Sequence, residues 1–264
     1  MDLGLKGKRA LVTGSTAGIG FAAARTLARE GAEVVVNGRT EERVRAAVEA
    51  IEREVPGAQV RGVAADLGSA EGCAQVTRRV AELDILVNNV GIFEPKPFDE
   101  IPDEDWLRFF ETNVMSGVRL SRHYVAGMRA RNWGRIVFIS SESGLQIPVE
   151  MIHYGVTKTA QIALARGLAE SLASTGVTVN SVLPGPTNSE GVGEFITRLA
   201  RARGTDAAQA EREFFATARP TSIIQRFATI DEVAAMIGFV CSERASATTG
   251  AALRVDGGVV RAIP

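Results

Sequence analysis

Cysteine and histidine are scarce in this sequence, with two of each among 264 residues. Cys73 and Cys241 lie far apart and form no CxxC pair, so we expect two small buried thiols and no disulfide. His123 and His153 have no partners at metal-ligand spacing, so the sequence predicts neither a zinc site nor another metal site. Each histidine is expected to be either solvated or hydrogen-bonded.

Strong net charge and long apolar runs are also absent. The formal net charge is −1, so the sequence offers no basic field for nucleic acid or an anionic membrane. No apolar run reaches the roughly 18 residues of a membrane-spanning helix, and the start MDLGLKGKRA lacks an apolar signal core. We therefore expect a cytoplasmic protein that acts on a small molecule. Its length allows one large domain, 1–264, with a substantial core.

Short β-branched runs alternate with longer helical patterns along the chain. Most runs are almost wholly apolar, which is typical of strands covered on both faces of a parallel sheet. The predicted strands are Arg9–Thr13, Glu33–Asn37, Val60–Ala65, Ile85–Asn88, Arg135–Ser140, Val177–Leu183 and Ala251–Val255. The predicted helices are Ile19–Glu30, Glu41–Val55, Ser69–Ala81, Asp103–Arg131, His153–Ser174 and Ile230–Ser242. This order predicts an α/β fold, a single doubly wound, Rossmann-like domain with a seven-stranded parallel sheet and helices on both faces.

One region, 186–227, breaks the alternation. It predicts no strand, and it mixes charged residues with Phe195, Leu199, Phe214 and Phe215, which favours short amphipathic helices. An insertion after the carboxyl end of a strand would overhang the crevice where such sheets bind ligands. We therefore predict a substrate lid over 186–227, and the alternative is a solvated excursion anchored in the core.

A glycine-rich turn, TGSTAGIG at 13–20, follows the first predicted strand and opens the first helix. Its glycines permit a tight turn and a close approach of the backbone to a pyrophosphate. The start of the helix offers unpaired N–H groups to the phosphates. In this strand–turn–helix context the turn predicts a dinucleotide site.

The second predicted strand ends in Asn37-Gly38-Arg39, without a carboxylate. A fold selective for NAD usually ends this strand in Asp or Glu, which binds the ribose 2′-hydroxyl. Arg39 can instead pair with a 2′-phosphate. The pattern favours NADP(H) over NAD(H), and the alternative is a surface Arg39 that pairs with Glu41 or Glu42.

Tyr154 and Lys158 lie four residues apart at the start of a predicted helix, so they share one face. Ser141 stands 13 residues before Tyr154, at the end of the fifth predicted strand. A free tyrosine has a pKa of about 10, and both a nearby Lys⁺ and the positive end of a helix lower it. The pattern predicts a lowered pKa for Tyr154 and a role as general acid and base.

Taken in order, these motifs resemble the short-chain dehydrogenase/reductase family nearly from end to end. Asp66-Leu67 follows the third strand, NNVG at 88–91 follows the fourth, and Asn113 lies in the long central helix. Pro184-Gly185 follows the sixth strand and DGG at 256–258 ends the seventh. The resemblance is to 3-oxoacyl-[acyl carrier protein] reductases and to sugar or polyol dehydrogenases.

The resemblance implies a carbonyl/alcohol oxidoreductase that uses hydride transfer, and it implies a homotetramer. Ser141 would hydrogen-bond the substrate oxygen and Tyr154 would pass the proton. Lys158 would lower the pKa of Tyr154 and hold the nicotinamide ribose, and Asn113 would anchor a water behind Lys158. With Arg39, the expected cofactor-binding residues are Gly14, Ser15, Thr16, Gly18, Ile19, Gly20, Asp66, Leu67, Asn88, Gly91, Tyr154, Lys158, Pro184, Gly185, Thr187 and Ser189.

Several of these positions have a structural alternative. Asp66 could cap a helix as Ser69 does, Asn88 could tie two strands together, and Asn113 could cap or kink its helix. The residues between Ser141 and Tyr154 are expected to shape the substrate pocket; they include Glu142, Gln146, Glu150 and Met151. Two other functions stay open, an NAD-dependent alcohol or polyol dehydrogenase and a non-catalytic nucleotide-binding sensor.

Overall fold

The computed structural model describes residues 2–189, 192–193, 197–198, 200–201 and 204–263. Its main sheet has seven strands, all parallel, in the order β3-β2-β1-β4-β5-β6-β9. The strands are β1 Arg9–Val12, β2 Glu33–Gly38, β3 Val60–Ala64, β4 Ile85–Asn88, β5 Gly134–Ile139, β6 Val177–Pro184 and β9 Ala252–Val255. Each predicted strand is confirmed, with ends that differ by at most one residue.

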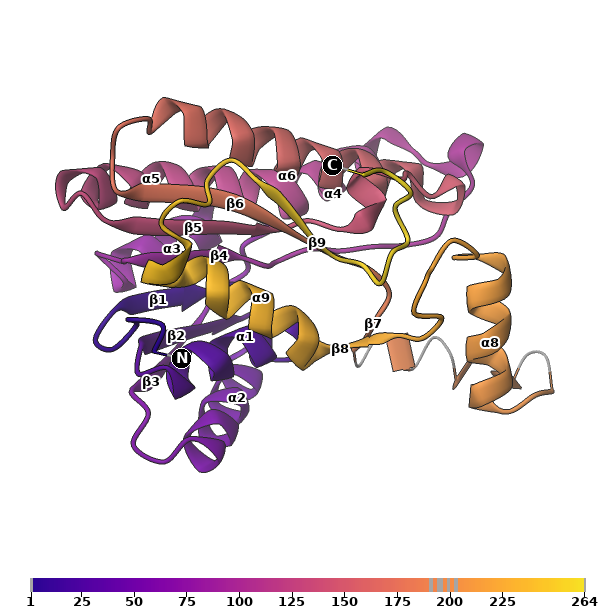
Figure 1. Ribbon diagram of the computed structural model, residues 1–264, viewed down its shortest axis with the longest axis horizontal. Coiled ribbons are helices and arrows are strands. Elements are labelled where there is room, and N and C mark those ends of the chain that lie inside the picture. Colours follow the sequence, from indigo (N-terminus) through magenta and orange to yellow (C-terminus); the bar gives the residue numbers. More distant parts are fainter. Residues whose placement is uncertain (1, 190–191, 194–196, 199, 202–203, 264) are drawn as a thin grey trace.

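Helices cover both faces of this sheet, as Figure 1 shows. They are α1 Gly18–Arg29, α2 Glu41–Glu54, α3 Ala70–Arg79, α4 Asp103–Phe110, α5 Ser116–Ala130, α6 Ile152–Ser171, α8 Ala207–Thr217 and α9 Ile230–Cys241. Several begin at side-chain caps. Thr40 accepts a hydrogen bond from Arg43 N at the start of α2, and Ser69 accepts one from Gly72 N at the start of α3. Thr229 and Glu232 form a capping box on α9.

The core lies in two layers, one on each face of the sheet. One layer packs the sheet against α1, α2 and α9, through side chains such as Leu27, Ile51 and Ile237. The other packs it against α3, α5 and α6, through Val76, Leu120 and Ala165 among others. Because both faces are buried, the central strands consist of nearly uninterrupted Val, Ile and Leu.

The order of the strands reverses between β1 and β4. The chain proceeds from β1 through β2 to β3 on one side, and then returns to place β4, β5, β6 and β9 on the other. In open α/β sheets, ligands bind outside the carboxyl ends of the strands at such a reversal. The turn after β1 and the turn after β4 therefore mark the place where a ligand is expected.

The long central helix is interrupted, which corrects the prediction of one regular helix over Asp103–Arg131. Residues Glu111–Met115 form a π-helical segment between α4 and α5. Such segments are rare and often occur at functional sites. Asn113 lies in this segment, so the backbone around it departs from regular α-helical geometry.

The prediction that 186–227 contains no strand is wrong. Thr187–Asn188 forms the short strand β7, which pairs in parallel with β8, Ala228–Thr229. A two-residue strand is too short to produce a hydrophobic pattern, so it could not be predicted. The amphipathic helix expected here is α8, which buries Ala210 and Phe215. Phe195 and Leu199 lie outside the described residues.

Helix α8 stands apart from the body of the molecule, at the right of Figure 1, beyond the β7–β8 pair. Its Phe214 and Phe215 pack against Phe227, with ring centroids 5.2 and 5.1 Å away. These contacts join α8 to the segment that leads back to β8. Among the described residues, no helix is both long and apolar enough to cross a lipid bilayer.

Candidate active site

The glycine-rich turn after β1 is held in place by asparagines. Gly14 has φ +59°, a conformation that strains other residues, and its N–H donates to Asn37 Oδ1 at 3.2 Å. Asn89 Nδ2 donates to the carbonyls of Thr13 and Gly14, at 2.9 and 3.0 Å. A Cβ at Gly20 would lie 2.5 Å from both Asn89 Nδ2 and Gly14 O. Glycine is therefore required at Gly20 by close packing.

Helix α1 starts without a side-chain cap. Its N-cap residue is Ala17, no side chain accepts a hydrogen bond there, and the first turn contains no acidic residue. Free N–H groups at a positive helix end favour an anion. Gly18, Ile19 and the backbone around them therefore fit the pyrophosphate of a dinucleotide.

Ser15 does not belong to the cofactor surface, which corrects the prediction. Its side chain is fully buried, and its hydroxyl donates to Val12 O at 2.6 Å and accepts from Asn37 N at 3.0 Å. Its own N–H donates to Asn37 O. These bonds join the turn to β2, so Ser15 is a structural residue. Thr16 is half-buried instead and packs against Gly38 at the end of β2.

Arg39 is exposed immediately after β2. Within the described part of the chain it forms no ion pair or hydrogen bond, and Glu41 pairs with Arg79 at 3.8 Å instead. The alternative that Arg39 is held by Glu41 or Glu42 therefore has no support. Its guanidinium is available to a phosphate beside the end of β2.

Asp66 and Leu67 follow β3 but differ in exposure. Asp66 is exposed and its Oδ1 accepts from Gly68 N at 3.0 Å, which closes a turn before α3. Ser69, and not Asp66, is the N-cap residue of α3. The Leu67 side chain is buried in the core, so only its backbone can face a ligand.

Asn88 ends β4 and is buried. Its Nδ2 donates to Ser121 Oγ of α5 at 3.2 Å, so it joins a strand to a helix and does not tie two strands together. Its Oδ1 is buried and has no hydrogen-bond partner among the described residues. An unpaired buried acceptor at the strand reversal fits a ribose hydroxyl. Gly91, three residues later, leaves room beside Lys158: a Cβ there would lie 3.3 Å from Lys158 Nζ.

The loop after β6 approaches the glycine turn. Pro184 is the last residue of β6, and a Cβ at Gly185 would lie 2.6 Å from Asp256 O in the DGG turn. The Thr187 hydroxyl is buried and donates to Gly185 O at 2.9 Å. A Cβ at Gly18 would lie 3.4 Å from Ser189 Cβ. The predicted residues after β6 and those after β1 therefore border the same place.

Ser141, Tyr154 and Lys158 come together at the carboxyl end of β5. Ser141 follows the strand, and its Oγ accepts from Ser143 N at 3.1 Å. Tyr154 and Lys158 lie in the first two turns of α6, and Lys158 Nζ is 5.5 Å from the centroid of the Tyr154 ring. Lys158 is buried and its Nζ donates to Ile139 O at 2.8 Å.

The pKa of Tyr154 is raised, so the prediction of a lowered pKa is wrong. Burial is the main cause, and the charge of Glu142 acts in the same direction, whereas Ser141 and Arg219 oppose them. Burial also lowers the pKa of Lys158 to about 7, so Lys158 carries only part of a charge at neutral pH. The sequence pattern placed the ammonium beside the phenol, but it contained no sign of the nearby carboxylate or of the extent of burial.

Asn113 connects three elements behind this group. Its Oδ1 accepts from Ile92 N at 2.8 Å, and its Nδ2 donates to Ile92 O at 3.0 Å and to Thr157 Oγ1 at 2.9 Å. Its main-chain carbonyl accepts from Gln161 Nε2 at 2.6 Å. Asn113 thus fixes the loop after β4 to α6, and its carbonyl oxygen has a second lone pair for a water.

A family model for short chain dehydrogenases matches residues 8–199. The chain belongs to the short-chain dehydrogenase/reductase family. The oxidoreductase YvaG of Bacillus subtilis, itself uncharacterized, is 48% identical over the whole of both chains. The crystal structure of L-sorbose reductase from Gluconobacter frateurii, complexed with NADPH and L-sorbose, has a TM-score of 0.94, 34% identity and full coverage of both chains. The 3-oxoacyl-[acyl-carrier-protein] reductase of Aquifex aeolicus is 34% identical over 98% of this chain and 100% of that protein.

These comparisons confirm the resemblance to 3-oxoacyl reductases and to sugar dehydrogenases. Members of this family are oxidoreductases that act on carbonyl and alcohol groups with a nicotinamide cofactor, and the chain is one of them. Among the described residues, no group of three or more His, Cys, Asp and Glu side chains is arranged to hold a metal ion.

Sequence reasoning missed one charged residue beside this short-chain dehydrogenase site. Arg219 is buried, and its Nε donates to Glu142 Oε1 at 2.9 Å while its Nη1 donates to Glu150 Oε1 at 3.1 Å. Glu142 was expected only to shape the pocket, yet its carboxylate accepts a hydrogen bond from Ser141 Oγ at 2.5 Å. No sequence signal distinguishes Arg219 from the other arginines of 186–227.

The expectation that each histidine is solvated or hydrogen-bonded holds for His123 but not for His153. His123 is exposed, as predicted. His153 is fully buried between Phe109 and Trp106, and neither ring nitrogen has a hydrogen-bond partner among the described residues. Burial lowers the pKa of His153, which keeps the imidazole neutral. Cys73 and Cys241 are both buried free thiols.

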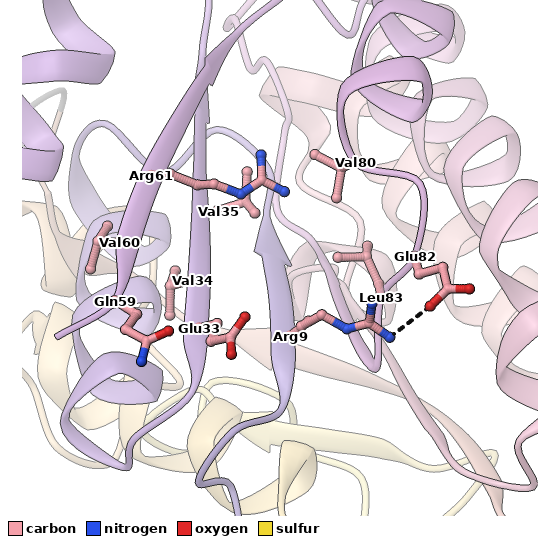
Figure 2. A pocket seen from close by; sticks show the side chains of 10 residues that line it. All are labelled: Arg9, Glu33, Val34, Val35, Gln59, Val60, Arg61, Val80, Glu82 and Leu83. Atoms are coloured by element: carbon pink, nitrogen blue, oxygen red, sulfur yellow. Dashed lines mark hydrogen bonds and ion pairs between the residues drawn. The ribbon is translucent and has the colours of Figure 1, made fainter.

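A separate cavity of about 210 Å³ lies far from this site, at the amino ends of β1, β2 and β3 (Figure 2). It is lined by Arg9, Glu33, Gln59 and Arg61 among others. Because this fold binds its ligands at the opposite, carboxyl ends of the strands, the cavity is no candidate for the cofactor.

Proposed function

We propose that this enzyme reduces a ketone or aldehyde with NADPH, and that Tyr154 donates the proton to the carbonyl oxygen. The observation that carries the proposal is the meeting of Ser141, Tyr154 and Lys158 beside the glycine turn, at the reversal of the strand order. No other described part of the chain combines a hydroxyl, a phenol and an ammonium with an uncapped helix start.

The cofactor would lie across the carboxyl ends of β1 and β4. Gly14, Gly18 and Gly20 would line its pyrophosphate, the Asn88 amide would meet a ribose, and Lys158 would hold the nicotinamide ribose. The loop from Pro184 to Thr187 would border the nicotinamide. When bound, NADPH supplies the hydride that reduces the carbonyl carbon.

The protonation state of Tyr154 is the one that reduction requires. A phenol whose pKa lies above its ordinary value of 10 is protonated at neutral pH, and this is the form that donates a proton. Oxidation of an alcohol needs the phenolate, which burial and Glu142 disfavour. In reduction, the Ser141 hydroxyl would stabilise the oxygen as it gains charge. Lys158 would stabilise the phenolate that Tyr154 leaves behind.

Preference for NADPH over NADH rests on Arg39. The second strand ends without a carboxylate, and the exposed Arg39 guanidinium has no partner in the described part of the chain. The bidentate geometry of arginine suits a ribose 2′-phosphate. The L-sorbose reductase of similar structure was solved with NADPH, which is consistent with this preference.

Three further expectations stay predictions. We propose that 186–227 acts as a lid, because Arg219 within it contacts Glu142 beside Ser141. We propose a homotetramer, for which the exposed Leu107 of α4 and the exposed Phe98 before that helix are candidate contacts and light scattering is the test. A cytoplasmic location remains a prediction from the sequence.

The experiment replaces the two tyrosines of the chain in turn. A screen of ketones, sugars and 3-oxoacyl thioesters with NADPH and NADH first identifies a substrate. Tyr154→Phe should then lower kcat by at least about 100-fold, because a general acid contributes about 10² to 10⁴. Its affinity for NADPH, measured by fluorescence titration, should be unchanged.

Tyr124→Phe is the matched control. The Tyr124 hydroxyl is buried and donates to Val80 O at 2.7 Å, far from Ser141, so this variant should lose some stability and keep its turnover. Full turnover in Tyr154→Phe would refute Tyr154 as the acid. Failure of the wild-type protein to reduce any carbonyl in the screen would refute the proposed function.

A further inference from the structure

A buried ion pair lies directly beside Ser141. The side chains of Glu142 and Arg219 keep 6% and 11% of their surfaces exposed, and Arg219 Nε donates to Glu142 Oε1 at 2.9 Å. Charged residues are almost never buried unless they are paired. Arg219 belongs to the segment between β6 and α9, so this pair joins that segment to the end of β5.

The two oxygens of Glu142 have different surroundings. Oε1 is held by Arg219, which is anchored in turn by Glu150 at 3.1 Å and by Ala218 O at 2.7 Å. Oε2 accepts a hydrogen bond from Ser141 Oγ at 2.5 Å. Arg219 therefore fixes the carboxylate so that one oxygen faces the candidate catalytic serine. The charge of Glu142 also acts on the Tyr154 phenol, which places the carboxylate at the reaction site.

The single hydroxyl proton of Ser141 limits which substrates the site can bind. A serine hydroxyl has one proton to donate, and here that proton is given to Glu142. In the proposed reaction the same proton must turn to the carbonyl oxygen of the substrate. Glu142 Oε2 would then be a buried charged acceptor without a donor, which is unfavourable. A suitable substrate must bring a replacement donor.

We propose that Glu142 accepts a hydrogen bond from a substrate hydroxyl on the carbon next to the carbonyl, so that α-hydroxy ketones, the class that includes ketoses, are the preferred substrates. This inference rests on the proposed function. Ser141 Oγ and Glu142 Oε2 lie 2.5 Å apart, a spacing that two substrate oxygens on neighbouring carbons can match.

The same arrangement disfavours other carbonyl compounds. A 3-oxoacyl thioester has no hydroxyl next to its ketone, so it would leave Glu142 Oε2 unpaired once Ser141 turns away. A 2-oxo acid would place its own carboxylate against that of Glu142, and two like charges in a buried site repel each other. Glu142 is therefore a specificity-determining residue, which favours α-hydroxy ketones over 3-oxoacyl thioesters and 2-oxo acids.

The test compares 1-hydroxy-2-butanone with 2-butanone, which differ by one hydroxyl. With NADPH, the wild-type kcat/KM should be at least about 100-fold higher for the hydroxy ketone, since a site built to bond a hydroxyl rejects the analogue that lacks it. Glu142→Gln keeps the shape of the side chain and removes its charge, and it should lower this ratio by about tenfold or more. Most of the loss should fall on the hydroxy ketone.

Glu170→Gln is the matched control, because it removes an exposed carboxylate of α6 that pairs with Arg166 and contacts neither Ser141 nor Arg219. It should keep the wild-type ratio. Thermal unfolding and NADPH titration check that each variant is folded. Should Glu142→Gln fail to fold, Glu142→Asp, which keeps the charge and shortens its reach, should also lower the ratio, and the wild-type ratio is decisive by itself.

Equal kcat/KM for the two ketones in the wild type would overturn the role of Glu142 and leave the proposed function standing. An unchanged ratio in Glu142→Gln would do the same, as would reduction of other carbonyl compounds but of neither butanone. If the wild type reduces no carbonyl compound at all, both the proposed function and this inference fail together.

Discussion

The turn after β1 and the segment after β5 lie at the same edge of the sheet but are built differently. The turn can present only backbone groups to a ligand. Its glycines leave space, the Ser15 hydroxyl is hydrogen-bonded to Val12 O inside the protein, and no side chain caps α1. The segment after β5 offers buried charge: Glu142 and Lys158 are largely removed from water, as is Arg219, which contacts Glu142 from the segment between β6 and α9.

This difference matches what each region would have to recognise. A pyrophosphate is the same in every dinucleotide, so N–H groups and an open helix end are sufficient to bind it. A substrate must be distinguished from similar compounds and then protonated, which needs side chains whose charge is tuned by burial. Buried charge destabilises the fold, so the two regions should respond differently to substitution.

The largest expected effect is on stability at Lys158. Its folded-state pKa of about 7 lies below the ordinary value of 10.5, so between these values the unfolded chain binds more protons than the folded chain. The stability of the wild type should therefore rise with pH across that window. Lys158→Met removes the buried ammonium and should stabilise the protein at pH 6 by an amount on the order of 4 kcal/mol. Urea unfolding without cofactor measures the difference.

The advantage of Lys158→Met should shrink as the pH rises from 7 toward 10, because folding of the wild type releases the Lys158 proton in this range and the cost of that release falls with rising pH. The variant should also lose activity, since the phenolate loses its neighbour. A constant stability difference from pH 6 to pH 10 would show that the ammonium is not titrating in a buried site, and the contrast between the two regions would lose its main support.

The framework of both regions could be predicted from the sequence. The strands ended within one residue of the apolar runs because strands buried on both faces leave an uninterrupted pattern, as at Ile85–Asn88. Tyr154 and Lys158 came together because helical spacing alone puts them on one face. These inferences depend on neighbours in the chain, which is what a sequence displays.

The errors have causes that no local sequence pattern displays. The pKa of Tyr154 is set partly by Arg219, 65 positions away, and by a burial that no local pattern reports. Ser15 was predicted to bind the cofactor because it belongs to the glycine-rich motif. In the structure, its hydroxyl and its N–H are both hydrogen-bonded to the backbone of Asn37 in the next strand. The π-helical segment at Glu111–Met115 has the same apolar pattern as an ordinary helix, so only the structure distinguishes it.

A smaller effect is expected at Arg39, the exposed arginine that follows β2. Arg39→Ala should weaken NADPH binding by about 10- to 100-fold, the value of one or two hydrogen bonds to a charged group. NADH binding should change little, because NADH has no 2′-phosphate. Calorimetric titration of both nucleotides measures the ratio of the two affinities.

Arg45→Ala is the control for Arg39. Arg45 is also exposed and pairs only loosely with Glu49, at 3.8 Å within α2, so its loss should leave both affinities unchanged. Equal losses of NADPH and NADH affinity in Arg39→Ala would mean that Arg39 does not bind the 2′-phosphate. Recognition in this region would then depend on the backbone alone, and the preference for NADPH would need another source.

The smallest expected effect tests whether shape alone governs the glycine turn. A methyl group at Gly20 would lie 2.5 Å from Gly14 O and from Asn89 Nδ2, so Gly20→Ala must push the turn apart. Overpacking of this kind costs about 1–3 kcal/mol.

Gly167→Ala, in α6, is the control. The added methyl group meets nothing within 4 Å, and the variant should instead stabilise the helix by about 0.5–1 kcal/mol. Thermal unfolding and NADPH titration of the two variants separate a general response to the methyl group from a local one. NADPH affinity should fall in Gly20→Ala and persist in Gly167→Ala, and normal affinity in Gly20→Ala would mean that the cofactor does not contact this turn.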